Sequence, residues 1–244
     1  MAVHIGTSGW SYGHWDGVLY PEGLATGHRL EHYIREFRTV ELNASYYRWP
    51  TDTSFTNWRR RLPTNFILSV KAPRALTHAK RLYDPESWLA RIARGLMCLG
   101  RRAGVLLVQL PPAAEFDQAR LAYFLQCVPV NLRVCMEFRH PSWHQDATFE
   151  LLQEHGAAYC VMSGANLPCI LRATAGFVYV RLHGPDHHQM YAGSYTDDEL
   201  RWWSARIREW QAMGRDVFVY FNNDGGGNAV RNARMLLEMT SAER

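Results

Sequence analysis

Short apolar runs rich in β-branched and aromatic residues recur eight times along this 244-residue chain. Segments with the 3.6-residue period of amphipathic helices separate most of these runs. The eight runs are residues 3–8, 39–43, 66–71, 104–110, 133–138, 158–162, 177–183 and 217–222. Eight alternations of strand and helix in about 250 residues are typical of a (β/α)8 barrel. We therefore predict an α/β protein with a single TIM-type barrel domain over residues 1–244.

Helix signals support this arrangement, with one weak point. Residues 196–199, Thr-Asp-Asp-Glu, form a capping box that predicts a helix start. The segment after Ser163 has the weakest helical pattern, so we expect the sixth helix to be short or irregular. An open doubly wound sheet is the alternative fold, but the first predicted turn lacks the glycine fingerprint typical of that fold.

Composition limits the kind of protein. Hydrophobic residues make up 47% of the chain, which suffices for a large core and excludes a disordered protein. No apolar run approaches the roughly 20 residues of a membrane helix, and the first residues lead into a strand rather than a signal segment. The five cysteines lack metal-ligand spacing, so we expect reduced thiols. We expect a cytoplasmic protein without a membrane partner, and the sequence predicts no oligomeric state.

Positive charge is concentrated in one part of the sequence. Residues 59–102 contain 11 of the 27 Arg and Lys residues and only two acidic ones. This segment should attract anions, or else it is an ordinary solvated face. Only Lys71 and Lys80 are lysines. Lys71 closes a predicted strand, where an amine can lose a proton that a guanidinium would keep.

Polar side chains gather where the predicted strands end. Glu137 and Arg139 are the clearest pair, because their spacing places both on one face of a strand. Buried charges are costly unless they pair with each other or line a solvated cleft. The other strand-end residues with charged, amide or imidazole groups are Glu41, Asn43, Lys71, Gln109, Arg181, His183, Asn222 and Asn223. Barrel enzymes place their sites at this end, so we predict a site here; a lattice of ion pairs that only fixes the structure is the alternative.

Eight motifs spread over the chain resemble those of one family. They are Gly-Thr-Ser-Gly-Trp at residues 6–10, Leu-Tyr-Pro-Glu-Gly at 19–23, Val-Glu-Leu-Asn at 40–43, Val-Lys-Ala-Pro-Arg at 70–74, Gln-Leu-Pro-Pro at 109–112, Glu-Phe-Arg-His-Pro-Ser-Trp at 137–143, Tyr-Val-Arg-Leu-His-Gly at 179–184 and Tyr-Phe-Asn-Asn at 220–223. Together they closely resemble the YecE-like family, domain of unknown function 72. The resemblance implies a TIM-type barrel and brings no reaction with it. Members often have Asp at the position of Ser163.

Two features predict an anion site. Arg139 and Arg181 can each offer two parallel donors to a phosphate or carboxylate. The loop from Asn222 to Asn228 is rich in glycine, including Gly226, and leads into a predicted helix whose N-terminus attracts negative charge. The loops after the seventh and eighth strands of barrels often hold phosphate. A plain turn without a ligand is the alternative for this loop.

The acid and base candidates are Glu137, Lys71, His183 and Glu41. A carboxylate beside arginines should be ionised and suit a general base, whereas Lys71 near Arg74 could act as an acid or a nucleophile. A salt bridge from Lys71 to Glu41 or Glu137 is the structural alternative. A divalent metal on Glu41, Glu137 and His183 is not favoured, because lysine and arginine already supply positive charge there. The sequence does not identify a cofactor.

Aromatic residues in the segments after the strands could stack on a base or a sugar. The candidates are Trp10, Tyr12, Tyr46, Trp143 and Tyr191. Core packing is the alternative for about half of such residues. Our leading interpretation is an enzyme that acts on a phosphate-bearing or other anionic small molecule by acid/base chemistry. A non-catalytic nucleotide or nucleic-acid binding protein that uses the same pocket is the alternative.

Overall fold

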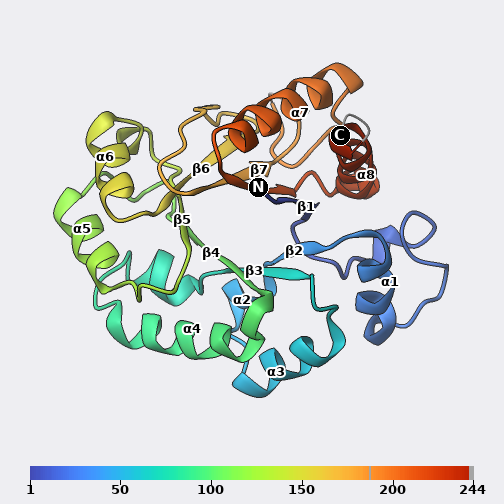
Figure 1. Ribbon diagram of the computed structural model, residues 1–244, viewed down its shortest axis with the longest axis horizontal. Coiled ribbons are helices and arrows are strands. Elements are labelled where there is room, and N and C mark those ends of the chain that lie inside the picture. Colours follow the sequence, from blue (N-terminus) through green and yellow to red (C-terminus); the bar gives the residue numbers. More distant parts are fainter. Residues whose placement is uncertain (187, 242–244) are drawn as a thin grey trace. The chain divides into compact units, whose positions relative to one another are not determined.

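The computed structural model describes residues 1–186 and 188–241 and contains eight parallel strands (Figure 1). The strands are β1 (Val3–Thr7), β2 (Thr39–Leu42), β3 (Ile67–Lys71), β4 (Ala103–Gln109), β5 (Val134–Glu137), β6 (Ala158–Ser163), β7 (Phe177–Leu182) and β8 (Asp216–Phe221). Their order is β1-β8-β7-β6-β5-β4-β3-β2. A bridge between Ser8 and Glu41 also joins the ends of β1 and β2. This arrangement is that of a (β/α)8 TIM-type barrel and excludes the doubly wound alternative.

Helices follow all strands but one. They are α1 (Arg29–Glu36), α2 (Ala44–Tyr47), α3 (Asp52–Arg61), α4 (Glu86–Leu99), α5 (Gln118–Cys127), α6 (Asp146–Glu154), α7 (Asp197–Ala212) and α8 (Asn228–Ser241). Residues 164–176, between β6 and β7, contain no helix. The expected weak sixth helix is therefore an irregular segment. A π-helix, Ala75–Ala79, lies between β3 and α4.

The chain divides into two compact units. The first comprises residues 1–41, 161–171 and 176–241. In this unit β8 pairs with both β1 and β7, and α7 and α8 pack against β8 (orange to red in Figure 1). Its core includes the fully buried Tyr179 and Tyr220. The capping box predicted at Thr196 is present at the start of α7. The expectation of a single domain over residues 1–244 stays a prediction.

The second unit comprises residues 42–160 and 172–175. Strand β4 pairs with β3 on one side and with β5 on the other. Residues 104–109 of β4 are buried throughout, as expected for a parallel strand that is covered on both faces. Helices α3 and α4 pack together in this unit. The predicted strand boundaries agree with the structure to within one residue.

Candidate functional site

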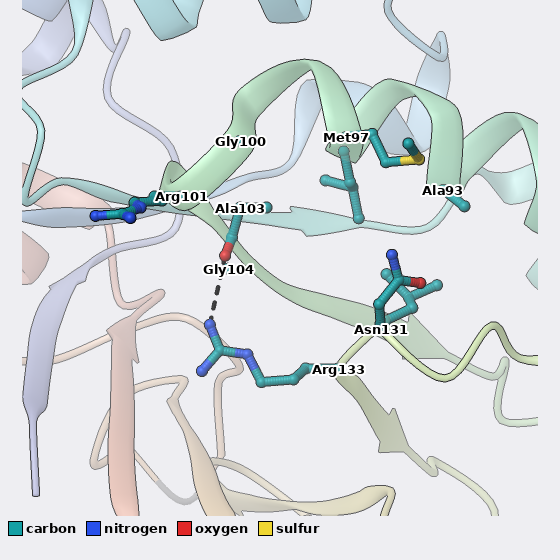
Figure 2. A pocket seen from close by; sticks show the side chains of 10 residues that line it. Ala93, Met97, Gly100, Arg101, Ala103, Gly104, Asn131 and Arg133 are labelled. Carbon is teal, nitrogen blue, oxygen red and sulfur yellow. Dashed lines mark hydrogen bonds between the residues drawn. The ribbon is translucent and has the colours of Figure 1, made fainter.

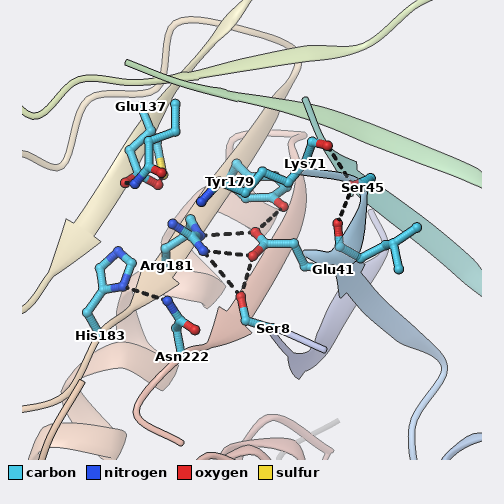
Figure 3. Close-up of polar contacts among 12 residues, drawn as sticks. Ser8, Glu41, Ser45, Lys71, Glu137, Tyr179, Arg181, His183 and Asn222 are labelled. Carbon is cyan, nitrogen blue, oxygen red and sulfur yellow. Dashed lines mark hydrogen bonds and ion pairs between the residues drawn. The ribbon is translucent and has the colours of Figure 1, made fainter. Parts of the chain in front are cut away.

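Glu41, at the end of β2 in the first unit, is a fully buried carboxylate with four hydrogen-bond donors (Figure 3). Arg181 on β7 contributes two of them, with Nε 3.0 Å from Oε2 and Nη2 2.8 Å from Oε1. The hydroxyl of Tyr179 donates to Oε2 at 2.7 Å, and the hydroxyl of Ser8 donates to Oε1. Burial and the nearby carboxylate hold the pKa of Tyr179 well above its ordinary value, so Tyr179 remains a donor.

This arrangement is the ion-pair lattice that the sequence left open as an alternative. Arg181 is 1% exposed, and two edges of its guanidinium are occupied by Glu41 and by Ser8 Oγ at 3.3 Å from Nη2. Such a pair is costly to break, because either partner would then lose the opposite charge that the other supplies in the buried interior. Glu41 and Arg181 therefore serve first as a scaffold for the ends of β2 and β7.

His183 follows β7 in the same unit and is fully buried. Its Nδ1 lies 3.2 Å from the side-chain amide of Asn222, which follows β8 (Figure 3). The exposed ring of Tyr191 contacts the imidazole edge-on at a centroid distance of 5.4 Å. The backbone of Tyr191 has a positive φ of 69°, and its N–H donates to the carbonyl of His183 at 2.7 Å. These three predicted residues therefore lie together.

The glycine-rich loop after β8 leads into the last helix, as the sequence indicates. Gly226 has a φ of 64°, and α8 starts at Asn228. Asn223 is fully buried and donates to Asn232 Oδ1 at 2.8 Å and to the carbonyl of Gly193 at 3.0 Å. Asn228 also donates to Gly193, at 3.3 Å. Both amides therefore hold the neighbouring loop.

An acidic side chain lies at the start of this loop. Asp224 Oδ1 accepts a hydrogen bond from Trp15 Nε1 at 2.6 Å, and its Oδ2 lies 2.9 Å from His14 Nε2. Burial raises the pKa of Asp224, although its partners His14 and Trp15 oppose that shift. A carboxylate here would repel a phosphate, so the phosphate cradle stays a prediction with one feature against it.

Trp10 and Tyr12, also in the first unit, are both partly exposed. The carbonyl of Trp10 accepts a hydrogen bond from Tyr20, and Tyr12 donates to the carbonyl of Ser8 at 2.7 Å. These contacts anchor the segment that follows β1. They leave part of each ring at the surface, where it could contact a ligand.

In the second unit, the end of β5 carries the pair that its two-residue spacing predicts. Glu137 is fully buried, and its Oε1 lies 2.5 Å from both Nε and Nη2 of Arg139. Gln109, at the end of β4, donates to the same oxygen at 2.6 Å. The thiol of Cys160 lies 3.9 Å from Oε2. The register of β4 on β5 places Gln109 directly beside Glu137, which explains their contact.

A cationic and aromatic cluster lies at the end of β3. Lys71 Nζ is 4.6 Å from the ring centroid of Tyr46, and the imidazole of His78 contacts the same ring edge-on at 5.1 Å. All three side chains are partly exposed. Partial burial lowers the pKa of His78, and the charges of Lys71 and Arg74 lower it further. The carbonyl of Lys71 accepts a hydrogen bond from Ser45 at 2.6 Å, which fixes α2 against the strand end.

His78 is not among the site residues predicted from the sequence, although it follows Lys71 closely in the chain. Its position depends on the π-helix, in which Lys80 N–H donates to the carbonyl of Ala75 at 3.0 Å. Such helices contain one residue more per turn and often occur at functional sites. Hydrophobic periodicity does not reveal a π-helix, so only a histidine near the strand end could have suggested this position.

Trp143 and Asn43, two residues of the second unit that were predicted to contact a ligand, lie in surroundings that differ from a ligand-binding rim. Trp143 is 2% exposed, stacks on Phe138 at a centroid distance of 4.4 Å and donates from Nε1 to the carbonyl of Ala114. The structure thus places this indole in the core, away from the aromatic rim expected for it, because its one polar atom finds a backbone partner. Asn43 precedes α2, and its Oδ1 is buried without a hydrogen-bond partner among the described residues.

Neither a metal centre nor a membrane-spanning helix is found among the residues that the structure describes. Within residues 1–186 and 188–241, no three His, Cys, Asp or Glu side chains are grouped as metal ligands would be. None of the helices in the same part of the chain has the length and apolar character required to cross a bilayer.

The fold and the strand-end side chains define a TIM-type barrel protein with buried carboxylates at the carboxyl ends of β2 and β5. The chain belongs to the family described as Protein of unknown function DUF72, whose sequence model matches residues 4–244. The YecE-like family is this same family. The UPF0759 protein YunF of Bacillus subtilis is 28% identical to this chain over an alignment of 272 residues. The alignment covers 99% of this chain and 95% of that protein.

Two solved structures of DUF72 family proteins resemble this fold. The one from Thermotoga maritima has a TM-score of 0.87 and 30% identity, and the match covers 98% of this chain and 99% of that one. The one from Enterococcus faecalis has a TM-score of 0.85 and 18% identity, with coverage of 98% and 95%. The second likeness supports the fold alone.

Proposed function

We propose that this protein is a cytoplasmic enzyme that acts on a phosphate-bearing or other anionic small molecule by acid/base chemistry. The observation that carries this proposal is the cluster at the end of β3. There Lys71 and His78 contact the partly exposed ring of Tyr46, and Arg74 lies close enough for its charge to lower the pKa of His78. A neutral imidazole beside two cations is placed to exchange a proton with an anion that these cations attract.

The roles follow from what each side chain contacts. Lys71 and Arg74 attract the anionic group, and His78 serves as acid or base because its pKa lies below its ordinary value. Glu137, whose carboxylate is bound by Arg139 and Gln109, is the second base candidate. His183, Asn222 and Tyr191 are further contact candidates in the first unit. Glu41 and Arg181 hold the ends of β2 and β7 in the first unit and do not react.

Ligand binding is tested by following the imidazole of His78 by NMR during titration with inorganic phosphate and with a mononucleotide. An anion bound beside His78 favours the imidazolium, so the pKa of His78 should rise. Lys71→Met should weaken this response, whereas Lys80→Met should not. These two are the lysines of the chain, and Lys80 is an exposed residue paired with Asp84. A His78 pKa that no anion changes would contradict the proposal.

The alternative is a non-catalytic nucleotide or nucleic-acid binding protein. The observation in its favour is Tyr47, which is 84% exposed and contacts Tyr46 edge-on beside Lys71. Exposed aromatic rings next to cations suit stacked bases. Oligonucleotide binding that weakens steeply with salt and is unchanged in Glu137→Gln would favour this alternative. Turnover of a phosphate-bearing compound that is lost in Glu137→Gln would favour the enzyme.

A further inference from the structure

Two neighbouring pockets lie at the amino ends of β3, β4 and β5 in the second unit. One has a volume of about 500 Å³ and is lined by Arg59, Thr64, Asn65, Gly100, Arg101 and Arg102. The other has a volume of about 400 Å³ and is lined mainly by α4 and the starts of β4 and β5 (Figure 2). Gly100 and Arg101 line both pockets. Lys71 lies at the opposite end of β3, so these pockets are separate from the site proposed above.

The turn between α4 and β4 brings the arginines of the first pocket together. Arg59 is in the last turn of α3, and Arg101 and Arg102 belong to the turn at residues 100–102. Gly100 has φ 58° and ψ −131°, a conformation that is open to glycine and costly for other residues. A Cβ at this position would lie 3.5 Å from Cζ of Arg59, so the guanidinium of Arg59 lies over the turn.

Arg59 and Arg101 differ from other arginines of the same unit, which form ion pairs with acidic side chains. Arg94 pairs with Asp52 at 2.8 Å, and Arg139 pairs with Glu137. In the described part of the chain, by contrast, neither Arg59 nor Arg101 has an ion-pair partner, and no Asp or Glu lines either pocket.

Arg102 is held in a fixed orientation beside them. Its Nε donates to the carbonyls of Leu62 and Pro63, each at 2.9 Å. Three guanidinium groups around one pocket repel each other, and an anion between them would relieve that repulsion. The hydroxyl of Thr64 and the amide of Asn65 add further hydrogen-bonding groups to the same pocket.

The second pocket has a different character. Leu96, Met97 and Leu132 give it apolar walls, and Asn131 offers both a donor and an acceptor. The thioether of Met97 is available for contact, since this residue is 67% exposed. In Figure 2, Arg101 points away from Met97 and Asn131, and thus lies at the border between the apolar and the basic pocket.

We propose that the paired pockets form a second ligand site, which binds a phosphorylated small molecule of mononucleotide size. The phosphates bind Arg59, Arg101 and Arg102, because planar guanidinium groups match phosphate oxygens. An apolar or heteroaromatic group occupies the adjoining pocket against Met97 and Leu96. The two volumes are in the range of small-molecule sites. This proposal does not depend on the enzyme proposed above.

The test is calorimetric titration of the full chain with ADP and with inorganic pyrophosphate. Arg59→Gln and Arg101→Gln should each weaken both ligands about tenfold, the effect of losing one charge-assisted contact. Arg60→Gln is the matched control, because Arg60 is an exposed neighbour of Arg59 that lines neither pocket. All titrations are also made in the Lys71→Met background, so that binding at the site proposed at the other end of β3 does not contribute to the measured affinities.

A further variant tests the apolar pocket. Met97→Asp should weaken ADP and leave pyrophosphate binding nearly unchanged. Failure of wild-type protein to bind either ligand would overturn the proposal, as would an equal loss in Arg60→Gln. Binding to vesicles of anionic phospholipid without binding of ADP would also overturn it, since the basic pocket would then serve a membrane surface.

Discussion

At the scale of single residues, the hydrogen-bond donors around Glu41 indicate that this carboxylate has a structural role rather than a catalytic one. Each carboxylate oxygen accepts two hydrogen bonds, from Arg181 and from either Ser8 or Tyr179. A carboxylate that accepts two hydrogen bonds at each of its oxygens is a poor general base. Lys71 and His78 contact the ring of a partly exposed tyrosine instead, and they remain closer to solvent.

Replacing Glu41 should reveal its structural role. Glu41→Gln removes the counter-charge that Glu41 supplies to the buried Arg181, so the free energy of unfolding should fall by about 3–5 kcal/mol. Tyr179→Phe removes a single hydrogen bond to a charged group and should cost about 1.5–3 kcal/mol. The double change of Glu41→Leu with Arg181→Met should recover much of the loss, because it removes both charges. Urea unfolding measures all three; a smaller loss in Glu41→Gln than in Tyr179→Phe would contradict this role.

The lowered pKa of His78 has a defined effect on stability. Above about pH 6.5 His78 is neutral in both the folded and the unfolded chain. As the pH falls below that value the unfolded chain takes up a proton first, so stability decreases until the folded state is protonated too. His78→Gln should remove this part of the acid destabilisation, measured by urea unfolding between pH 7 and pH 5. An unchanged pH dependence in the variant would contradict the shift.

At the scale of elements, two segments depart from regular barrel structure. The π-helix after β3 positions His78 beside Lys71, and the segment between β6 and β7 contains no helix within residues 164–176. The other crossover segments contain α-helices, and side-chain caps begin α3, α5 and α7. Helix α7 is the best example, because the side chains of Thr196 and Glu199 bond reciprocally to the backbone of each other.

The capping box of α7 provides a stability prediction. Thr196→Ala removes the acceptor for the N–H of Glu199 and should lower the free energy of unfolding by about 1 kcal/mol. Thr196→Ser keeps a hydroxyl and should remain close to the original stability. Thermal unfolding of the two variants tests the difference, which would be absent if the cap did not contribute.

At the scale of the whole molecule, the net positive charge is small, and the position of the basic residues determines where anions are attracted. The net charge is +4, yet the 11 basic residues of the segment 59–102 supply cations to both ends of β3. Cations of the protein itself can thus neutralise a bound anion.

This charge pattern predicts how the protein responds to metal removal. Dialysis against a chelator should leave the melting temperature unchanged, and elemental analysis of protein purified without chelator should find no stoichiometric divalent metal. The lysines and arginines at the strand ends are the physical reason. A stoichiometric metal whose loss lowers the melting temperature would contradict this prediction.

The sequence predicts the fold and part of the site. Strand boundaries follow from apolar runs, and the Glu137–Arg139 contact follows from their spacing along one strand. Spacing gives the face on which a side chain lies, but it does not tell which distant groups bond to it. The pairing of Glu41 with Arg181 therefore did not follow from the sequence. Core packing was open as an alternative for Trp143, but the sequence did not identify the backbone carbonyl of another segment that accepts its indole N–H.

The Glu41–Arg181 pair also bears on how this chain is made. The two residues are separated by 140 positions, so Glu41 leaves the ribosome long before its guanidinium partner has been synthesised. Until then the carboxylate is better hydrated than buried, and the end of β2 has to stay wet. Dehydration of that end is consequently a late event in biosynthesis, and a truncated chain that stops before β7 would keep it open to solvent and to chaperones.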